Sequence, residues 1–495
     1  MTRFSPSKFR LLFAVFAAWL SVAGAALSAD NVLFIAVDDM NDFTSALKGY
    51  DGEVHTPNLD RLAERGVTFC HAVAASTVCC PSRTAIMLGQ RPSTTGIYNN
   101  GQWWRPHRPN AVSIPMYFRR HGYTAVGAGK IFHHPAGFNP PNQWDDFQRL
   151  VFHDDPWFRG SRLHYPWTEP QPFPTDYPFC GISGMPHEND WGVLPGISET
   201  EYDDARTAQY AIDFLGREHD KPFFLACGMF RPHLPWYVPQ KYFDLYPLDA
   251  IELPEVLEDD LDDVPAEGRE LSKRRREDFL RIKGAGKWKQ AVQAYLACIS
   301  FSDAQVGRVL NALRDSPYRD NTIVVFWSDH GWHLGEKNHW HKSTLWEEAA
   351  RIPLIWAGPG IANGRCQRSV DTMCIYPTLV ELCGLPPREN LDGVSIVPLL
   401  KNPAAQWDQP GITEFNRGQC AVRSQRYRYI RYGDGSEELY DHQKDPREWN
   451  NLAGDPDFAE VKKALGKWVT NEWAQPAPSK GAYRFNPDTY TWTKR

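Results

Sequence analysis

The chain has 495 residues, of which 42% are hydrophobic, and a formal net charge of −6 at neutral pH. A chain of this length and composition can bury one large core and a smaller one, while its negative charge argues against a nucleic-acid-binding protein. Its ten cysteines are too sparse for a scaffold held together by disulfides.

The first thirty residues have the pattern of an export signal. Three basic residues, Arg3, Lys8 and Arg10, precede an apolar run over residues 11–26, and small residues follow it. This order is typical of a secretory signal peptide, and no other stretch of the chain has the apolar length that a membrane span needs. We therefore expect residues 1–29 to be removed, the mature protein to have no membrane span, and its location to be periplasmic or secreted.

Five short apolar runs, rich in β-branched residues, alternate with helical patterns along the chain. Near-continuous apolar strands of this kind are typical of a mostly parallel sheet that is covered by helices on both faces. The sequence therefore predicts an α/β fold with strands over residues 31–37, 123–128, 222–228, 322–328 and 353–357.

Other segments have different patterns. Residues 255–282 are rich in charges of alternating sign, which is typical of a solvated insertion or helix face, and residues 289–313 have the apolar spacing of a long helix with one buried face. Beyond Pro403, short alternating strands separated by turns indicate a small antiparallel sheet. We expect three regions, which are the signal peptide over 1–29, a large domain over 30–404 and a C-terminal α+β subdomain over 405–495.

Polar and titratable side chains follow the first four apolar runs. In open parallel sheets, ligands bind beyond the carboxyl ends of the strands, so residues at these positions converge on one edge. Three carboxylates and an imidazole among them suit a hard divalent cation, Ca²⁺ before Mg²⁺, although an Asp-Asp pair by itself is more often a turn or a helix cap. The residues of this expected catalytic centre are Asp38, Asp39, Lys130, His133, His233, Asp329 and His330.

The segment Cys79-Cys80-Pro81-Ser82-Arg83 comes directly before an apolar helical pattern that ends at Gly89. Because proline suits the first turn of a helix, Cys79 is expected at the helix N-terminus, where backbone N–H groups and the helix dipole favour an anion. Arg83, one turn into the helix, can add a charge-assisted hydrogen bond to that anion. Taken alone, the segment also fits a turn with two buried cysteines before an ordinary helix.

This segment resembles the C-x-P-S-R signature of the sulfatases, and other stretches resemble sulfatase blocks in the order that the family has. These stretches are residues 31–39, 56–63 and 328–336, together with Lys342. The resemblance implies an alkaline-phosphatase-like fold and the hydrolysis of sulfate esters. It also implies that a formylglycine-generating enzyme oxidises Cys79 to formylglycine during export, and that one cation, Ca²⁺, is bound by Asp38, Asp39, Cys79, Asp329 and His330.

Two departures from the commonest sulfatase pattern are similar to the iduronate-2-sulfatase branch. His330 stands where most members have asparagine, and Lys130 and His133 are three residues apart instead of two. Residues 102–105 and 231–233 are also similar to that branch, which acts on sulfated uronic acids of glycosaminoglycans. The resemblance therefore implies a sulfated carbohydrate as the substrate.

The resemblance also implies a role for each site residue. The hydrate of formylglycine at position 79 would attack the sulfur atom, and Arg83 could donate its charge-assisted hydrogen bond either to the sulfate or to this hydrate. Lys130, Lys342, Arg83 and the cation would offset the charge that grows on the sulfate oxygens. His233 would donate a proton to the departing sugar oxygen, and His133 would take the proton whose loss expels sulfate and restores the aldehyde.

Two alternatives to a sulfatase stay open at the level of sequence. A phosphomonoester or phosphodiester hydrolase of the same superfamily would use the same strand-end ligands, although such enzymes usually carry two metal ions and a Thr or Ser nucleophile. The other alternative is a catalytically silent glycan-binding homologue, although every expected catalytic position is filled. Trp103 and Trp104 fit either a sugar-stacking platform or core packing.

Overall fold

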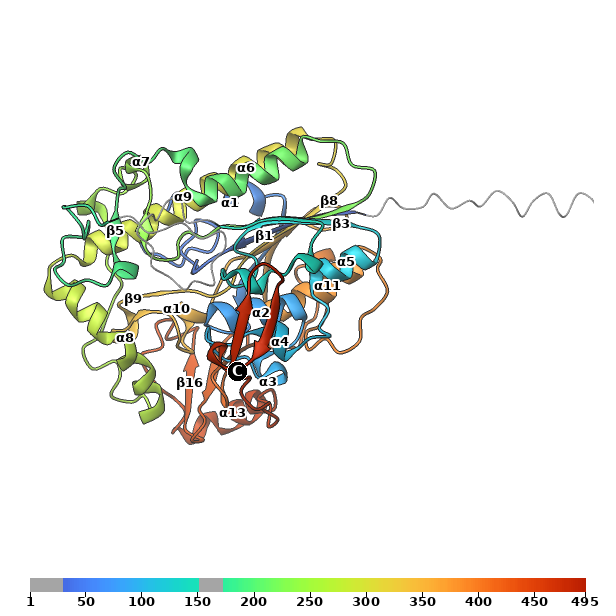
Figure 1. Ribbon diagram of the computed structural model, residues 1–495. Helices are drawn as coiled ribbons and strands as arrows, with labels where there is room; N and C mark the ends of the chain where they lie inside the picture. The colour runs from blue at the N-terminus through green and yellow to red at the C-terminus, as the bar shows by residue number, and fades with distance from the viewer. Residues whose placement is uncertain (1–29, 151–171) are drawn as a thin grey trace, which may run out of the picture.

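The computed structural model describes residues 30–150 and 172–495, and a large sheet with helices on both faces runs through its centre (Figure 1). Residues 1–29, where the signal peptide is predicted, lie outside the described residues. Within the described part of the chain, no helix has the length and apolar character needed to cross a membrane.

The central sheet has eight strands in the order β12-β2-β11-β8-β1-β6-β3-β4. Every pairing in it is parallel except those of β11, which runs antiparallel to both β2 and β8. The predicted mostly parallel sheet is confirmed, and all five predicted strands belong to it. Its members are β1 (Asn31–Val37), β2 (Gly66–Val73), β3 (Thr124–Gly129), β4 (Asp146–Gln148), β6 (Phe223–Gly228), β8 (Thr322–Ser328), β11 (Leu354–Ala357) and β12 (Gly364–Asp371).

The buried strand β1 contributes to two hydrophobic cores, one on each face of the sheet. Because alternate side chains of a strand point to opposite faces, Leu33 and Ile35 pack with α1, α6 and α9, whereas Val32 and Phe34 pack with α2, α5 and α11. Burial of each such side chain stabilises the fold by about 1.5–3 kcal/mol. Figure 1 shows the first three helices above the sheet and the other three below it. These helices are α1 (Pro57–Ala63), α6 (Asp203–Leu215), α9 (Trp288–Asp315), α2 (Cys79–Leu88), α5 (Ile114–Arg120) and α11 (Ile375–Leu382).

Helix α2 carries the cysteine motif and is buried along its whole length. It begins at Cys79, as predicted, after the extended residue Val78, and Pro81 lies in its first turn. The helix ends where Gly89 adopts a left-handed conformation with φ 71° and donates its N–H to the carbonyl of Ala85 at 2.8 Å. The start of the helix therefore places Cys79 beneath the surface, next to the edge of the sheet.

The C-terminal part of the chain contains the predicted small antiparallel sheet, β13-β14-β15-β16, and a separate hairpin, β17-β18. The charge-rich segment 255–282 forms much of α8, and the predicted long helix is α9. The domain boundary at residue 405 stays a prediction. The remaining elements are α3 (Pro92–Thr95), α4 (Trp104–His107), β5 (Trp191–Gly192), β7 (Trp236–Tyr237), α7 (Gln240–Phe243), α8 (Ala266–Gly284), β9 (His333–Leu334), β10 (Trp340–His341), α10 (Glu347–Ala350), α12 (Val397–Lys401), β13 (Gly411–Phe415), β14 (Gln419–Arg423), β15 (Tyr427–Arg431), β16 (Glu437–Asp441), α13 (Ala459–Gly466), β17 (Tyr483–Asn486) and β18 (Thr491–Lys494).

A buried ion network joins the C-terminal sheet to α10. Glu347 at the start of α10 pairs with Arg428 of β15 and, at 3.1 Å, with Arg423 of β14. Glu448 pairs with Arg428 at 2.8 Å and with His442 at 2.9 Å. Burial by itself raises the pKa of Glu347, but the two arginines outweigh it and hold that pKa well below its ordinary value.

We expect Glu347→Gln to lower the free energy of unfolding by about 3–5 kcal/mol, because it removes the carboxylate partner of the buried Arg423 and leaves Arg428 with Glu448 alone. Denaturant unfolding at neutral pH measures this effect, and Arg314→Gln, in an exposed pair with Asp315, is the matched control. Since the folded pKa of Glu347 is depressed, its contribution is present above its unfolded pKa and is lost as the pH falls toward the folded value. Equal unfolding curves for the two variants would contradict a stabilising role for the network.

Candidate active site

The ends of two neighbouring strands bring four of the predicted ligands together. Val37 of β1 lies opposite Ser328 of β8, so Asp38 and Asp39 emerge beside Asp329 and His330. The backbone N–H of Asp39 donates to Asp329 Oδ1 at 3.1 Å. Asp39 has the left-handed backbone conformation, φ 59°, which costs a non-glycine residue energy and turns its carboxylate toward the strand ends.

The thiol of Cys79 lies in the middle of these groups. Its Sγ is 3.1 Å from Lys342 Nζ, 3.4 Å from His330 Nε2 and 4.0 Å from Asp39 Oδ1. Lys342 also pairs with Asp39 Oδ1 at 2.5 Å. Burial lowers the pKa of Lys342, but the negative groups around it, Asp39 first among them, together outweigh burial and raise it, so the side chain keeps its positive charge beside the thiol.

Arg83 forms ion pairs with two carboxylates of the site. Its Nε is 2.7 Å from Asp329 Oδ2 and its Nη2 is 3.0 Å from Asp38 Oδ1, with all three side chains fully buried. Its Nη1 donates to the main-chain carbonyl of Lys130 and, at 3.1 Å, to that of Ile131. The structure therefore gives Arg83 a different task from the sulfate contact expected from sequence, because protein acceptors occupy its donors and it orients two carboxylates.

Lys130 and His233 complete the charged part of the site. Lys130 Nζ pairs with Asp38 Oδ2, and His233 Nε2 lies 4.0 Å from Asp38 Oδ2 and 3.9 Å from Asp39 Oδ2. The His233 side chain is 23% exposed, whereas the two carboxylates are fully buried, so it borders the solvent side of the centre. Burial, together with Lys130 and Lys342, lowers the pKa of His233 well below its ordinary value.

His133 lies next to this group without touching Cys79. It is buried with its ring edge-to-face with Phe138, the centroids 5.3 Å apart, and its Nδ1 has no hydrogen-bond partner among the described residues. Burial lowers the pKa of His133 well below its ordinary value, and the charges of Lys480 and Lys130 add to the effect. The structure thus brings His133 to the side of the site and keeps it neutral.

The donor set fits a hard cation. Ligand atoms of Asp39, Cys79, Asp329 and His330 all lie within 4.8 Å of one another, as do those of Asp38, Asp39, Cys79 and His233. Asp39 Oδ2 is buried and has no hydrogen-bond partner within the described ranges, and burial raises the pKa of Asp39 to about 7 although Lys342 opposes the shift. A cation at Asp39 would satisfy the bare oxygen and favour the ionised carboxylate.

Comparison with known proteins identifies the family. A family model described as Sulfatase matches residues 30–385, and one described as N-sulphoglucosamine sulphohydrolase, C-terminal, matches residues 335–475. The chain belongs to the sulfatase family. It is a sulfuric ester hydrolase, and the family generally depends on formylglycine and a metal ion.

Two relatives with similar sequences are themselves named as sulfatases. A protein of Formosa agariphila named Sulfatase is 39% identical over 473 residues, which cover 92% of this chain and 89% of the relative. Iduronate 2-sulfatase of Homo sapiens is 32% identical over 416 residues, which cover 74% of this chain and 70% of the relative. The resemblance to the sulfatases seen in the sequence is confirmed, with an iduronate 2-sulfatase among the homologues.

Two solved structures share the fold of this sulfatase. One is a complex with its substrate D-glucosamine-2-N,6-O-disulfate, with a TM-score of 0.68, 22% identity and coverage of 89% of this chain and 96% of the other. The other is the phosphonate monoester hydrolase of Agrobacterium radiobacter, with a TM-score of 0.69, 24% identity and coverage of 94% and 99%. The predicted alkaline-phosphatase-like sulfatase fold is thereby confirmed.

Three contributors to the sulfatase site were not found from sequence. The Ser82 hydroxyl donates to the main-chain carbonyl of Asp329 at 2.6 Å, and the Tyr295 hydroxyl donates to that of Asp39 at 2.7 Å. Lys480, from the far C-terminal end, adds its charge beside His133. Ser82 is part of the cysteine motif and could have been identified, whereas nothing in the surroundings of Tyr295 or Lys480 in the sequence signals their position.

Trp103 and Trp104 are core residues. Their exposed fractions are 1% and 0%, and the Trp104 ring stacks on Phe132 with centroids 5.2 Å apart. Of the two interpretations left open, core packing is the one that the structure supports.

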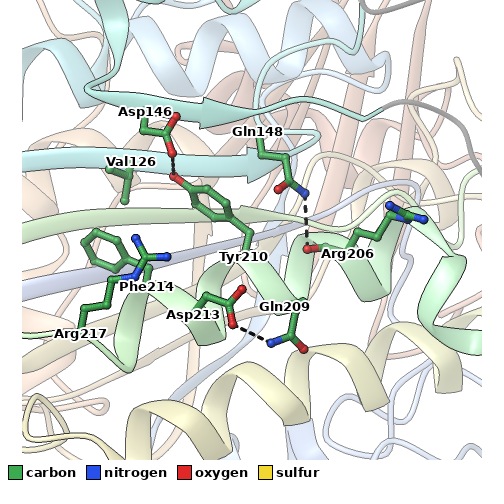
Figure 2. Close-up of a pocket in the computed structure, with 9 residues that line it drawn as sticks. All are labelled: Val126, Asp146, Gln148, Arg206, Gln209, Tyr210, Asp213, Phe214 and Arg217. Carbon is green, nitrogen blue, oxygen red and sulfur yellow. Dashed lines mark hydrogen bonds between the residues drawn. The ribbon is translucent and has the colours of Figure 1, made fainter.

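A cavity of about 500 Å³ lies away from the sulfatase site, between the β4 edge of the sheet and α6 (Figure 2). Four of the polar side chains that line it form two hydrogen bonds with one another. The Tyr210 hydroxyl donates to Asp146 at 2.7 Å, and the Gln209 amide donates to Asp213 at 2.8 Å. None of the predicted catalytic residues lines it. This cavity therefore has no part in the chemistry of the site.

Proposed function

We propose that this sulfatase removes sulfate from a uronate-containing glycan, in the manner of an iduronate 2-sulfatase, with formylglycine derived from Cys79 and one Ca²⁺ ion. The observation that carries the proposal is the set of contacts at Cys79, where Lys342 and His330 approach the Sγ at 3.1 and 3.4 Å at the buried start of α2. The 32% identity to iduronate 2-sulfatase of Homo sapiens supports the choice of substrate class.

The residues around Cys79 suit the binding of a sulfate ester. At the start of α2 the positive end of the helix dipole favours an anion beside the Sγ. The backbone N–H groups expected there are engaged, because that of Cys80 donates to Asn100 Oδ1 at 2.9 Å, that of Ser82 donates to the Val78 carbonyl at 3.0 Å, and Pro81 has none. Lys342 and Lys130 add two positive charges that stabilise negative charge on sulfate oxygens. Asp38, Asp39, Asp329 and His330 would hold a divalent cation, which would supply Lewis-acid stabilisation of the same oxygens. Arg83 keeps Asp38 and Asp329 in place for that cation.

The two histidines serve the proton transfers. His233, on the solvent side of the carboxylates, is placed to protonate the departing sugar oxygen. Lys130 and Lys342 disfavour its protonated form in the free protein, and the negative charge of a bound sulfate ester opposes that effect. We assign to His133 the role of the base that restores the aldehyde, because it lies beside the site and burial favours its neutral form, which can accept a proton.

A phosphoester hydrolase is the less favoured alternative. The phosphonate monoester hydrolase of Agrobacterium radiobacter is similar in fold, and its 24% identity carries no argument about the substrate. The cysteine motif of this chain is complete from Cys79 to Arg83, and each predicted metal ligand is present. These residues also argue against a silent glycan-binding homologue.

Maturation and location follow from the same proposal. Conversion of Cys79 requires a formylglycine-generating enzyme as a partner during export. The basic and apolar pattern of residues 1–29 supports export to the periplasm or the outside of the cell.

A desulfation screen tests the function. The exported protein is incubated with defined sulfated oligosaccharides, with and without uronic acid, and with the phosphate esters of matched alcohols, and released sulfate and phosphate are quantified. Release of sulfate from uronate-containing oligosaccharides is the expected result. Faster release of phosphate would favour the alternative, and release of neither ion would reject a catalytic function.

We expect His233→Ala to reduce kcat/KM on a sulfated disaccharide by about 10²–10⁴-fold, and to reduce it far less on 4-nitrophenyl sulfate. A sugar alkoxide needs a proton to leave, whereas nitrophenolate is a good leaving group without one. Steady-state kinetics on both substrates measure the difference, and His219→Ala, a histidine packed between α6 and the end of α9, is the control. Equal losses of kcat/KM on the two substrates would show that His233 binds the substrate or supports the structure of the site and does not donate the proton.

A further inference from the structure

The C-terminal segment of the chain is fastened to the region that follows α2. Ala477 donates its N–H to the Gly96 carbonyl at 2.7 Å, and the Gln102 side chain donates to the Ala477 carbonyl at 2.6 Å. Ser479 pairs with Gln102 in an antiparallel bridge. Figure 1 shows the following hairpin, β17-β18, in front of α2 and α4. The last twenty residues are thus held against the catalytic domain by backbone contacts.

Aromatic packing fixes the hairpin in this place. The buried ring of Trp103 lies 5.5 Å from Phe485 and 6.0 Å from Trp492, measured between centroids. On its other side, Trp103 lies 4.8 Å from Phe138. Phe138 in turn contacts the ring of His133. One continuous aromatic cluster therefore connects the hairpin to a histidine of the active site.

Lys480 directs a positive charge into this cluster. Its Nζ lies 5.0 Å from the centroid of Trp103 and 4.9 Å from that of Phe138, in the range of a cation–π contact. The residue is half-buried, and burial lowers the pKa of its ammonium group. Its charge acts on His133 and on the thiol of Cys80, which adjoins Cys79 in α2. The ammonium group is therefore one aromatic ring away from the catalytic centre.

Lys480 differs from the other cations near the site because it has no carboxylate partner in the part of the chain that the structure describes. Lys130, Lys342 and Arg83 each pair with an aspartate at the strand ends. For Lys480, no carboxylate oxygen of the described ranges, 30–150 and 172–495, lies within 4.0 Å of the Nζ. A half-buried ammonium that lies over two aromatic rings, with no carboxylate within 4.0 Å among the described residues, is poorly compensated for its lost hydration. An anion arriving with the substrate would provide that compensation.

We infer that Lys480 recognises a second anionic group of the glycan, a carboxylate or a further sulfate on the sugar residue that carries the scissile ester. The inference rests on the proposed function and adds a specificity-determining residue to it. Lys130 and Lys342 stabilise the charge on the scissile sulfate. Lys480 supplies an additional positive charge, so that the site binds a sulfated acidic sugar more tightly than a sulfated neutral sugar. Because the hairpin carries this lysine, the C-terminal end of the chain takes part in substrate selection.

The test measures binding in the absence of turnover. Cys79→Ala and Cys79→Ala/Lys480→Met proteins are titrated calorimetrically with a 2-O-sulfated uronate disaccharide and with the same disaccharide after reduction of its carboxyl group. A third ligand has the reduced carboxyl group and one more sulfate on the uronate-derived residue. Methionine retains the packing of the lysine stem, Lys480→Arg retains the charge, and Lys494→Met on the exposed side of the hairpin is the control.

Lys480→Met is expected to weaken binding of the uronate disaccharide about tenfold or more, because a charge-assisted hydrogen bond is lost. The carboxyl-reduced disaccharide should bind both proteins equally, Lys480→Arg should restore most of the affinity, and Lys494→Met should change nothing. If the loss appears with the ligand that has the extra sulfate and not with the uronate, the anion recognised is the sulfate.

Three outcomes would overturn the inference: an equal loss for charged and carboxyl-reduced ligands, no loss for any ligand, or no binding of any ligand to the Cys79→Ala protein. Failure of the proposed function is a separate result. In that case the converted wild-type protein releases no sulfate from these disaccharides, whereas the binding difference at Lys480 is still measured.

Discussion

Replacement of Cys79 with alanine is expected to reduce sulfatase turnover by roughly 10⁴-fold or more, because it removes the nucleophile while the rest of the site stays in place. The change deletes one buried sulfur atom at the first residue of α2 and leaves the proline and glycine that define the helix ends. The variant should therefore fold. Circular dichroism and thermal unfolding check the fold, and sulfate release from an aryl sulfate checks the activity.

Two further measurements connect this loss to formylglycine. Peptide mass spectrometry of the exported wild-type protein should show Cys79 without its sulfur and Cys80 unmodified. Cys80→Ala, at the variable position of the motif, is the matched control and should stay active. Cys79→Ser should take up sulfate once and then stop, since a single hydroxyl can be sulfated but has no second hydroxyl to expel the ester. A fully active protein with an unconverted Cys79 thiol would refute this mechanism.

Replacement of Asp329 with alanine is expected to abolish both metal binding and turnover, and to lower the free energy of unfolding by about 3–5 kcal/mol. The loss of stability has a specific cause, because Asp329 Oδ2 pairs with Arg83 Nε at 2.7 Å and both side chains are fully buried. Elemental analysis measures the metal, and denaturant unfolding measures the stability. Chelation of the wild type should remove activity with a smaller loss of stability, since only the binding energy of the cation is withdrawn.

Two variants separate the structural role of Asp329 from metal binding. The double variant Asp329→Ala/Arg83→Met should regain part of the stability, because it removes a buried guanidinium that would keep only Asp38 of its two carboxylate partners. It should regain none of the metal, because the lost ligand is not restored. Asp371→Ala is the matched control, since Asp371 pairs with Arg91 at 2.7 Å away from the site, and it should keep the metal. One Ca²⁺ per chain still bound by Asp329→Ala would contradict the ligand assignment, and two zinc ions in the wild type would favour a phosphoester hydrolase.

The sequence by itself determined the strands that build the site and the edge at which the site forms. Apolar runs are a local property of the chain, and their alternation with helices predicts that strands such as β1 and β8 are parallel, as the structure shows. The side chains that follow such runs therefore meet at one edge, and for this reason the sequence predicts that Asp38 and His330 lie close together. The start of α2 at Cys79 and its end at Gly89 were equally local, since Pro81 and Gly89 mark the two ends.

Only the tertiary structure decided what these side chains do to one another. Whether Arg83 faces a sulfate or two carboxylates depends on residues 45 and 246 positions away in the chain, and no periodicity carries that information. The same is true of Lys480, whose place beside His133 depends on how the final hairpin packs on Trp103. Long-range contacts depend on the shapes of side chains in a filled core, and a local sequence pattern specifies which residues are buried without specifying their neighbours.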